Sequence, residues 1–276
     1  MRENREYLDI LHGAMEMGQI KAYYQPGFKA DGFRIACATA VCRWDGRDGG
    51  SSPPSALMPR AEGAHAACLL DWYMADLVCG FISGPWPDTA HNVPIALPLS
   101  WRHIYEHDSP QRLSQIADAH GVEKDRLMVS FSEGALWAHD GNYAGDILHI
   151  IEGFRSQGFR VVLSGFGRNT NIPIFASKIP FDVLELDRSL IHACCTGTMG
   201  QDLLKHIFSY ADRWGALTVA DGVSRSEEVD FLCFNGCDIL QGEFLCGPLL
   251  GDEFMNVLGK PDIQMPPPPC RKGEGR

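Results

Sequence analysis

The sequence alternates short apolar runs with amphipathic helical segments, and this alternation constrains the fold more than any other feature. Two apolar runs come first, at residues 20–24 and 35–43, on either side of the turn sequence at residues 29–32, so we expect a hairpin there. Six further strands are expected at residues 93–99, 127–131, 159–163, 183–186, 217–220 and 238–241. Apolar residues at helical spacing predict helices at residues 5–17, 64–81, 110–120, 144–157, 201–214, 226–235 and 252–258.

Eight strands with interleaved helices indicate an α/β protein. We expect a modified (β/α)8 TIM-type barrel with one antiparallel strand near the N-terminus. Such a barrel needs about 250 residues, and the chain has 276, of which 45% are hydrophobic. We therefore expect one barrel domain over residues 1–260. Residues 261–276 contain four consecutive prolines and end in a Lys/Gly-rich stretch, which predicts a disordered tail or, as an alternative, a short proline-rich docking peptide.

The charge of the chain excludes some classes of partner. The formal net charge is -11, the isoelectric point is near 5.3, and lysine and arginine form no cluster of five or more. Phosphate neutralisation therefore cannot drive binding of a nucleic acid polymer, and an acidic surface disfavours an anionic membrane. No run of about 18 apolar residues is present, and the first 20 residues are too acidic for a signal peptide. We expect a cytoplasmic protein that makes no membrane contact.

Ten cysteines are spread through the chain, mostly in apolar contexts at irregular spacing. This pattern is typical of buried free thiols in a reducing compartment. Cys233 and Cys237 are the only pair with a spacing that fits a metal site, and no second Cys/His pair stands at zinc-finger spacing. The scattered histidines form no metalloprotease sequence, and neither a nucleophile elbow nor a phosphate-binding loop is present. We therefore expect no metal and no cofactor.

Three segments carry a resemblance to a known family. Tyr24-Gln25-Pro26 lies at the end of the first apolar run, the second run ends in Arg43-Trp44, and Gln241-Gly242 stands at the end of the last expected strand. Together they resemble the EAL family of cyclic-di-GMP phosphodiesterases, whose second strand carries Glu-Ala-Leu-Leu-Arg-Trp. The similarity extends along nearly the whole chain. It implies a site at the carboxyl ends of the barrel strands, where several carboxylates hold two divalent ions.

Most positions that hold metal ions in the EAL family carry other residues in this chain. Thr39 stands at the position of the first glutamate, Pro98 at that of an asparagine and Ser130 at that of a second glutamate. Ser164 and Gly165 replace the paired aspartates that bridge the two ions. Because hard divalent ions are held by several oxygen ligands, the resemblance implies that metal binding is weak or absent.

Two further positions differ from the family in charge or in length. Glu185 replaces the water-positioning lysine and so reverses its charge, and Asp221 replaces a glutamate with a side chain one methylene shorter. Glu133 is retained at what the resemblance implies is a supporting position. Carboxylates clustered without ions would repel one another, so we interpret the substitutions as the loss of a complete site.

The retained part of the family pattern includes four candidate ligand-binding residues: Gln25, Arg43, Pro59 and Gln241. In the family, the arginine that matches Arg43 contacts a phosphate of the cyclic dinucleotide, and a guanidinium suits that task. A structural interpretation is also available. Arg43 would stack at the barrel rim, Gln241 would form a tight turn with the following glycine, and Pro59 would begin a helix.

These observations lead to one main hypothesis and two alternatives. The main hypothesis is a catalytically inactive EAL-like domain that acts as a bacterial signalling or regulatory protein through contacts with a protein partner. Its recognition surface would be the altered strand-end face or the outer helices. The first alternative is a receptor that binds cyclic-di-GMP through Arg43 and Gln25 without hydrolysing it. The second is residual phosphodiesterase activity supported by Asp221 and Glu133.

Overall fold

Eight strands form a closed barrel in the part of the chain that the computed structural model describes. The structure describes residues 2–45, 51–52, 60–61, 66–87, 92–134, 144–168, 180–195 and 198–258. The barrel strands are β1 (Ile20–Lys29), β2 (Ile35–Asp45), β4 (Ile95–Pro98), β5 (Leu127–Ser132), β6 (Arg160–Phe166), β7 (Val183–Leu186), β8 (Leu217–Ala220) and β9 (Ile239–Gln241). The short strand β3 (Ser51–Ser52) pairs with β2 outside the ring.

The barrel is parallel except for its first strand. The sheet order is β1-β9-β8-β7-β6-β5-β4-β2, and the pairing of β1 with β2 closes the ring. β1 runs antiparallel to both β2 and β9, whereas the remaining neighbours are parallel. Two antiparallel strands can be joined by a short hairpin, while parallel strands need crossover connections. The fold predicted from the sequence, a modified (β/α)8 TIM-type barrel with one antiparallel strand, is confirmed.

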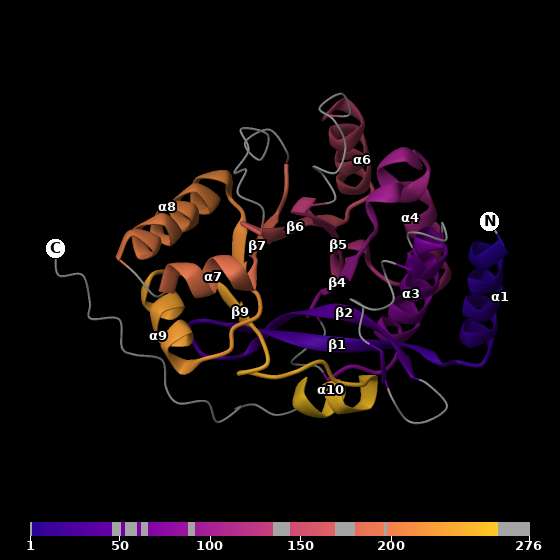
Figure 1. The fold of residues 1–276 in the computed structure, drawn as a ribbon, viewed down its shortest axis with the longest axis horizontal. Coiled ribbons are helices and arrows are strands. Elements are labelled where there is room, and N and C mark those ends of the chain that lie inside the picture. Colours follow the sequence, from indigo (N-terminus) through magenta and orange to yellow (C-terminus); the bar gives the residue numbers. More distant parts are fainter. Residues whose placement is uncertain are drawn as a thin grey trace.

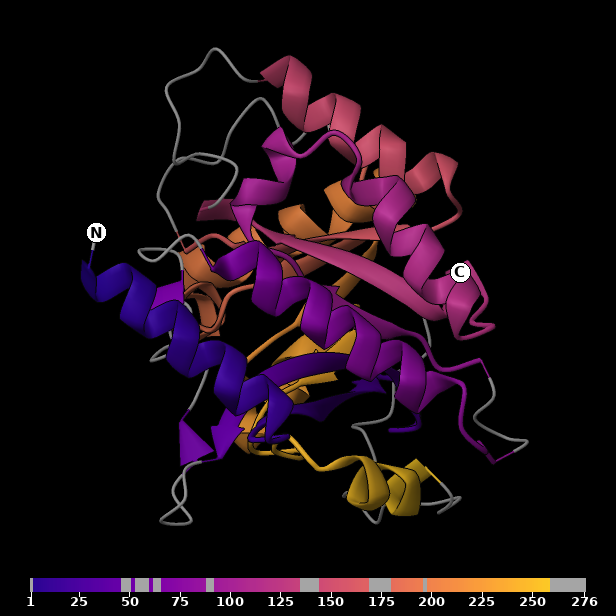
Figure 2. The same cartoon turned by 90° about the vertical axis from the view of Figure 1, so that its right-hand side faces the viewer.

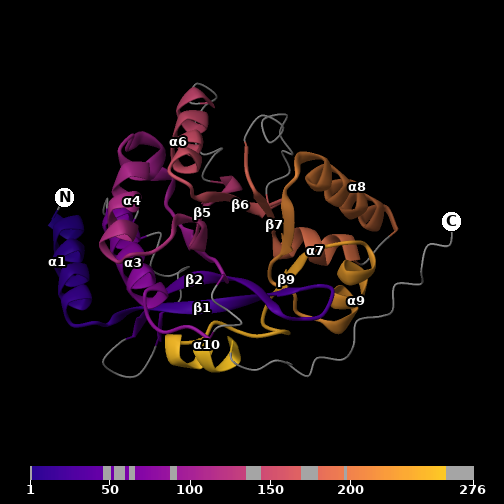
Figure 3. The ribbon, with the colours of Figure 1, turned by 180° about the vertical axis from the view of Figure 1, so that it is seen from behind.

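The helices surround the ring of strands, as Figure 1 shows, and Figure 3 shows the same arrangement from behind. They are α1 (Arg2–Glu16), α3 (Ala67–Ile82), α4 (Ser109–Ala119), α6 (Ala144–Ser156), α7 (Arg188–Cys195), α8 (Thr198–Trp214), α9 (Ser226–Phe234) and α10 (Gly251–Leu258), with the 3-10 helices η2 (Trp101–Tyr105) and η3 (Lys124–Arg126). In Figure 2, α1 lies beside α3, whose Tyr73 hydroxyl donates to the Met15 carbonyl (3.1 Å).

The last helix of the described residues covers the outer side of the opening hairpin. β1 and β2 are joined directly, so no crossover helix covers β1. α10 takes that place (Figure 1), and its Phe254 is fully buried against Tyr24 of β1 and Trp86, at ring-centre distances of 5.6 and 6.3 Å. Burial of such a ring removes a large apolar area from water. The C-terminal helix therefore completes the core of the barrel.

Side chains fill the barrel interior in layers. One inward-facing layer takes one residue from each of seven strands: Cys37, Ala96, Met128, Val162, Val183, Val219 and Ile239. The larger core between strands and helices contains the neighbouring residues of these strands, such as Ala38 and Leu97. Successive side chains of a strand point to opposite faces. The residue two positions after each layer member therefore faces inward again, closer to the carboxyl end of its strand.

The structure differs from the predicted alternation between β7 and β8. Two helices, α7 and α8, lie there, whereas apolar periodicity predicted only the second. α7 is eight residues long and begins after Asp187, whose Oδ1 accepts the backbone N–H of Ser189 (2.8 Å). Aspartate is a frequent helix N-cap, so this signal could have identified the helix. The expected domain boundary at 260 and the tail at 261–276 lie outside the described residues.

Candidate functional site

Seven side chains at the carboxyl ends of the strands occupy the inward-facing positions next to the buried layer. Each comes two residues after a layer member: Thr39, Pro98, Ser130, Ser164, Glu185, Asp221 and Gln241. We call this set the rim ring. Gln25 of antiparallel β1 lies opposite Thr39. Six altered positions identified in the sequence thus come together, and the seventh, Gly165, directly follows a ring member.

The part of the rim ring on β2, β4, β5 and β6 is uncharged. A pocket of about 290 Å³ opens there, and its lining includes Thr39, Pro98, Ser130 and Ser164. The acidic side chain that lines this pocket, Asp71 of α3, is only 4% exposed. It accepts the backbone N–H of Ser100 (2.8 Å) and lies 3.0 Å from Nε2 of His103. Among its described lining residues the pocket therefore offers hydroxyl groups and no uncommitted carboxylate.

Gln241 links the first and last strands of the barrel to β2. Its side chain is 2% exposed, its Nε2 donates to the carbonyl of Gln25 (2.9 Å), and its Oε1 accepts the Thr39 hydroxyl (3.3 Å). A Cβ atom on the next residue, Gly242, would lie 2.2 Å from the carbonyl oxygen of Val223, so no larger residue fits. In this structure Gln241 and Gly242 hold the strand end together.

The part of the rim ring on β7 and β8 is acidic. Burial, followed by the charges of Asp221 and Asp187, raises the pKa of Glu185 from an ordinary 4.5 to about 8. Burial also raises the pKa of Asp221 from 3.8 to about 6, with a contribution from Asp187 and against the opposing effects of a Gly222 backbone hydrogen bond and the charge of Arg188. Glu185 therefore keeps its proton near neutral pH, and this part carries less negative charge than its composition indicates.

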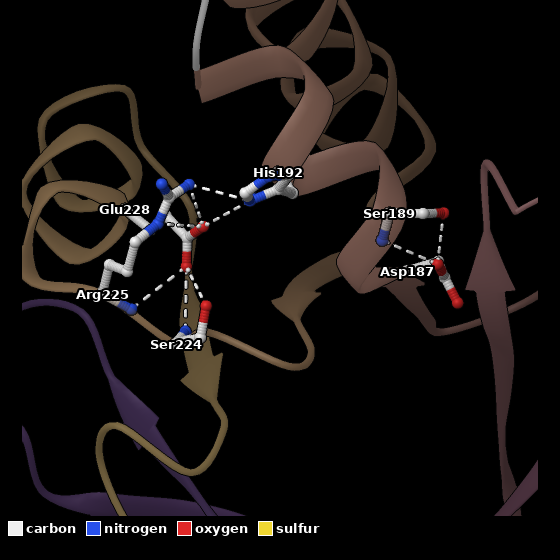
Figure 4. Close-up of polar contacts among 6 residues, drawn as sticks. All are labelled: Asp187, Ser189, His192, Ser224, Arg225 and Glu228. Atoms are coloured by element: carbon white, nitrogen blue, oxygen red, sulfur yellow. Dashed lines mark hydrogen bonds and ion pairs between the residues drawn. The ribbon is translucent and has the colours of Figure 1, made fainter.

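Polar contacts around Glu228 connect helices α7 and α9 (Figure 4). Glu228 is 2% exposed and accepts the backbone N–H of Ser224 and the Arg225 Nη2, each at 2.8 Å. His192 of α7 lies 2.8 Å from the same Arg225 nitrogen. Sequence patterns alone missed this network. Its signal is the glutamate three residues after Arg225, whose carboxylate accepts the backbone N–H of Arg225 (3.2 Å) at the start of α9.

The backbone is irregular at the end of β6. Its pairing with β7 shifts between Leu163 and Phe166, and Gly165 has a φ of 68°. This left-handed conformation costs residues other than glycine about 1–2 kcal/mol. Glu133, which directly follows β5, is 1% exposed, and its Oε2 accepts the backbone N–H of Gly167 (2.9 Å). Glu133 thus stabilises this segment through its backbone.

Arg43 lies on β2 two inward-facing positions beyond Thr39 and opposite Lys21 of β1. Its guanidinium carbon stands 5.2 Å from the centre of the Tyr23 ring, within the range of a cation–π interaction. Its Nε is buried and has no hydrogen-bond partner in the described part of the chain. Arg43 therefore has one N–H group that forms no hydrogen bond within the described residues. Pro59, the remaining candidate ligand-binding residue, lies outside the described residues.

Comparison with known proteins identifies the family. The family model for the EAL domain matches residues 8–248, which include all strands of the barrel. The chain belongs to the EAL domain family. The rim ring is therefore the strand-end face of an EAL domain, and the resemblance found in the first, second and last strands extends over the whole barrel.

Similar proteins include two longer proteins of Escherichia coli strain K12. The oxygen sensor protein DosP is 25% identical over 88% of this chain and 30% of its own length. The probable cyclic di-GMP phosphodiesterase PdeN is 22% identical over 95% of this chain and 49% of its own length. This EAL domain thus spans less than half the length of either relative.

Solved structures share the fold. The PaMucR phosphodiesterase in its c-di-GMP complex superposes with a TM-score of 0.80 at 22% identity, covering 90% of this chain and 99% of that one. The FimX EAL domain from Pseudomonas aeruginosa bound to c-di-GMP gives a TM-score of 0.77 at 18% identity, covering 88% and 96%. The barrel of this EAL domain therefore matches the barrels of these two proteins.

The cysteines of the described residues are free thiols, six of them buried and three half-buried, as their apolar contexts predicted. Cys233 and Cys237 belong to no group of three potential metal ligands within the described ranges. A search of the same residues finds no helix with the length and apolar character needed to cross a membrane.

Proposed function

We propose that this EAL domain does not hydrolyse cyclic di-GMP and acts in bacterial signalling as a regulatory protein, through contacts with a protein partner. The observation that carries the proposal is the composition of the rim ring. Its carboxylates come from β7 and β8, whereas β2, β4, β5 and β6 contribute hydroxyl groups and a proline. The free thiols of the described residues fit the reducing cytoplasm, where we propose that the protein acts.

The geometry gives a physical reason for weak binding of divalent ions. Mg²⁺ demands near-octahedral oxygen coordination and is usually bound by one or two carboxylates together with substrate phosphates and water. Thr39 is committed to Gln241, and Pro98 has no side-chain oxygen. Glu185 holds a proton near neutral pH, and Asp221 remains as a short carboxylate. Two ions held close together would need more ionised ligands than these residues supply.

An exposed apolar surface on α8 supports the second part of the proposal. Leu203, Tyr210 and Trp214 are 39%, 53% and 43% exposed and share one face of the helix, and the adjacent Leu217 is 43% exposed. Tyr210 and Trp214 stack with ring centres 6.0 Å apart. Large aromatic side chains are enriched at the centres of protein interfaces. This surface, which we call the α8 surface, fits a protein partner.

Capture of partners from native cytosol tests the proposal. The wild-type domain and the variant Trp214→Ser are compared, with Phe234→Ser as the matched control, because Phe234 is 69% exposed on α9. We expect a partner that binds the wild type and the control, that is lost with Trp214→Ser, and whose binding does not depend on cyclic di-GMP. Capture that is the same for all three proteins would contradict the role of the α8 surface.

A second candidate function is a receptor that binds cyclic di-GMP without hydrolysing it. The buried Nε of Arg43, which lacks a hydrogen-bond partner within the described residues, favours this alternative, since an arginine donor suits a phosphate oxygen. Calorimetry with the dinucleotide separates the two functions. Micromolar or tighter binding that is lost in Arg43→Ala and kept in Lys21→Ala supports the receptor. No binding by the wild type supports the interaction protein.

A further inference from the structure

Three potential metal ligands lie side by side where α3 meets η2, outside the rim ring. They are Cys68 in the first turn of α3, His103 in η2 and Glu106 directly after η2. Their sulfur, ring-nitrogen and carboxylate-oxygen atoms all lie within 4.8 Å of one another. His103 is fully buried, Cys68 is half-buried, and the Glu106 side chain is 41% exposed. The fold thus holds this cluster on one side and leaves it open to solvent on the other.

The imidazole of His103 is oriented from behind. Its Nε2 lies 3.0 Å from Oδ2 of Asp71, a buried carboxylate that also accepts the Ser100 N–H, and its ring meets the Trp72 ring edge-on at 4.6 Å between centres. The carboxylate favours the proton on Nε2, which leaves a lone pair on Nδ1, 3.5 Å from the Glu106 carboxylate. A carboxylate behind the second ring nitrogen is typical of histidines that ligate metals.

Without a bound ion, the atoms that would bind it form hydrogen bonds with their neighbours. The Ser109 hydroxyl lies 2.9 Å from Nδ1 of His103 and donates to it in this tautomer. Burial, followed by a hydrogen bond with Glu106, raises the pKa of the Cys68 thiol to about 12. An ion would replace both contacts. The Cys68 proton would leave to solvent as the sulfur–metal bond forms, and the Ser109 hydroxyl would turn away from Nδ1.

We propose that Cys68, His103 and Glu106 form a site for a divalent transition-metal ion of the Zn²⁺ class. One thiolate, one imidazole and one carboxylate match the ligands of Zn²⁺, whereas Mg²⁺ and Ca²⁺ take oxygen ligands. Three protein ligands leave a fourth position for water. Cysteine spacing gave no sign of this site because Cys68 and His103 are far apart in the chain. The site does not depend on the function proposed for the rim ring.

The site adjoins the pocket at the barrel mouth. Ser100 lines that pocket, donates its backbone N–H to Asp71, and has its hydroxyl oxygen 3.8 Å from the Cys68 sulfur. A bound ion would therefore fix α3 to the segment after β4, which forms one wall of the pocket.

Titration of the metal-free protein with Co²⁺ tests the site. Cobalt in a tetrahedral site shows visible absorption, and a cysteine ligand adds a thiolate-to-cobalt charge-transfer band in the near ultraviolet. We expect both for the wild type at one ion per chain, with displacement by Zn²⁺. Cys68→Ser should abolish the charge-transfer band. Glu106→Gln should weaken Co²⁺ binding by more than ~10-fold, because loss of a residue that only supports a metal ligand already weakens binding by about that factor.

Two matched variants complete the test. Ser109→Ala removes the competing hydroxyl and should bind Co²⁺ at least as tightly as the wild type. Cys195→Ser removes another half-buried thiol and should leave the spectrum unchanged. Circular dichroism checks that each variant is folded. If Cys68→Ser does not fold, the Co²⁺ affinity of Glu106→Gln, which changes an exposed side chain, tests the site instead. The proposal is overturned if the wild type gives no charge-transfer band, or if the band survives Cys68→Ser or is lost in Cys195→Ser.

Discussion

The acidic part of the rim ring makes the stability of the protein depend on pH, and Glu185→Gln should remove much of that dependence. The charges of Asp221 and Asp187 act on Glu185. Asp221 is in turn affected by the charge of Arg188, and Asp187 forms an ion pair with Arg168. The pKa of Glu185 is raised from 4.5 to about 8, chiefly by burial. Between pH 4.5 and pH 8, the folded protein therefore keeps a proton on Glu185 that the unfolded chain has released. The free energy of unfolding therefore falls as the pH rises from about 4.5 through 8, because ionised Glu185 is less stable in the folded protein than in the unfolded chain.

The magnitude follows from the shift. One pKa unit corresponds to about 1.4 kcal/mol, so the full shift would lower the free energy of unfolding by at most about 4 kcal/mol between pH 5 and pH 9. Coupling to Asp221 and partial exposure reduce this figure, and we expect about 1–3 kcal/mol. A glutamine is neutral at every pH and therefore does not contribute this pH-dependent loss of stability. Glu185→Gln should thus match the wild type near pH 5 and exceed its stability near pH 9.

Urea unfolding followed by circular dichroism at pH 5, 7 and 9 measures this difference. The control is Glu152→Gln, the same chemical change at an exposed position on α6; its difference from the wild type should not change with pH. Adding Mg²⁺ should leave all three proteins unchanged. A difference between Glu185→Gln and the wild type that stays constant from pH 5 to pH 9, or a loss of stability at pH 9, refutes the reasoning.

Two further substitutions test the packing of the barrel. Gly242→Ala should lower the free energy of unfolding by more than about 3 kcal/mol, because its Cβ would meet the Val223 carbonyl oxygen at 2.2 Å; an unfolding curve that coincides with the wild type would show that the turn can relax. Phe254→Ala should cost about 3–5 kcal/mol, since the ring is fully buried between α10 and β1. Hydrogen exchange should then be faster in α10 than in the rest of the barrel, and uniform exchange would contradict the role of this helix.

The sequence was sufficient to predict the barrel because its strands are short, apolar and separated by helical periodicity. The hairpin was visible in the turn between β1 and β2, and an antiparallel first strand follows from it. α7 was missed because it is only eight residues long, which is too short a stretch to establish a helical period. Its start was marked in the sequence by Asp187, whose side chain accepts the backbone N–H of Ser189.

The grouping of the site residues could be predicted only through the family resemblance. Within one strand, the alternation of apolar and polar residues identifies which side chains face inward. The register between strands decides which of these side chains lie at the same height in the barrel. Thr39 and Gln241 are 202 positions apart, and their hydrogen bond depends on the closure of the ring by β1. The cluster of Cys68, His103 and Glu106 escaped detection for the same reason, since tertiary packing of α3 against η2 creates it.

We propose that the strand-end face of this EAL domain does not hydrolyse cyclic di-GMP. Incubation of the purified domain with cyclic di-GMP and either Mg²⁺ or Mn²⁺, beside an active EAL domain, measures this directly when the linear dinucleotide is quantified by chromatography. We expect no linear product above the protein-free background with either ion. Metal-dependent formation of the linear dinucleotide at a rate comparable to that of the active domain would show that the altered rim ring still supports hydrolysis.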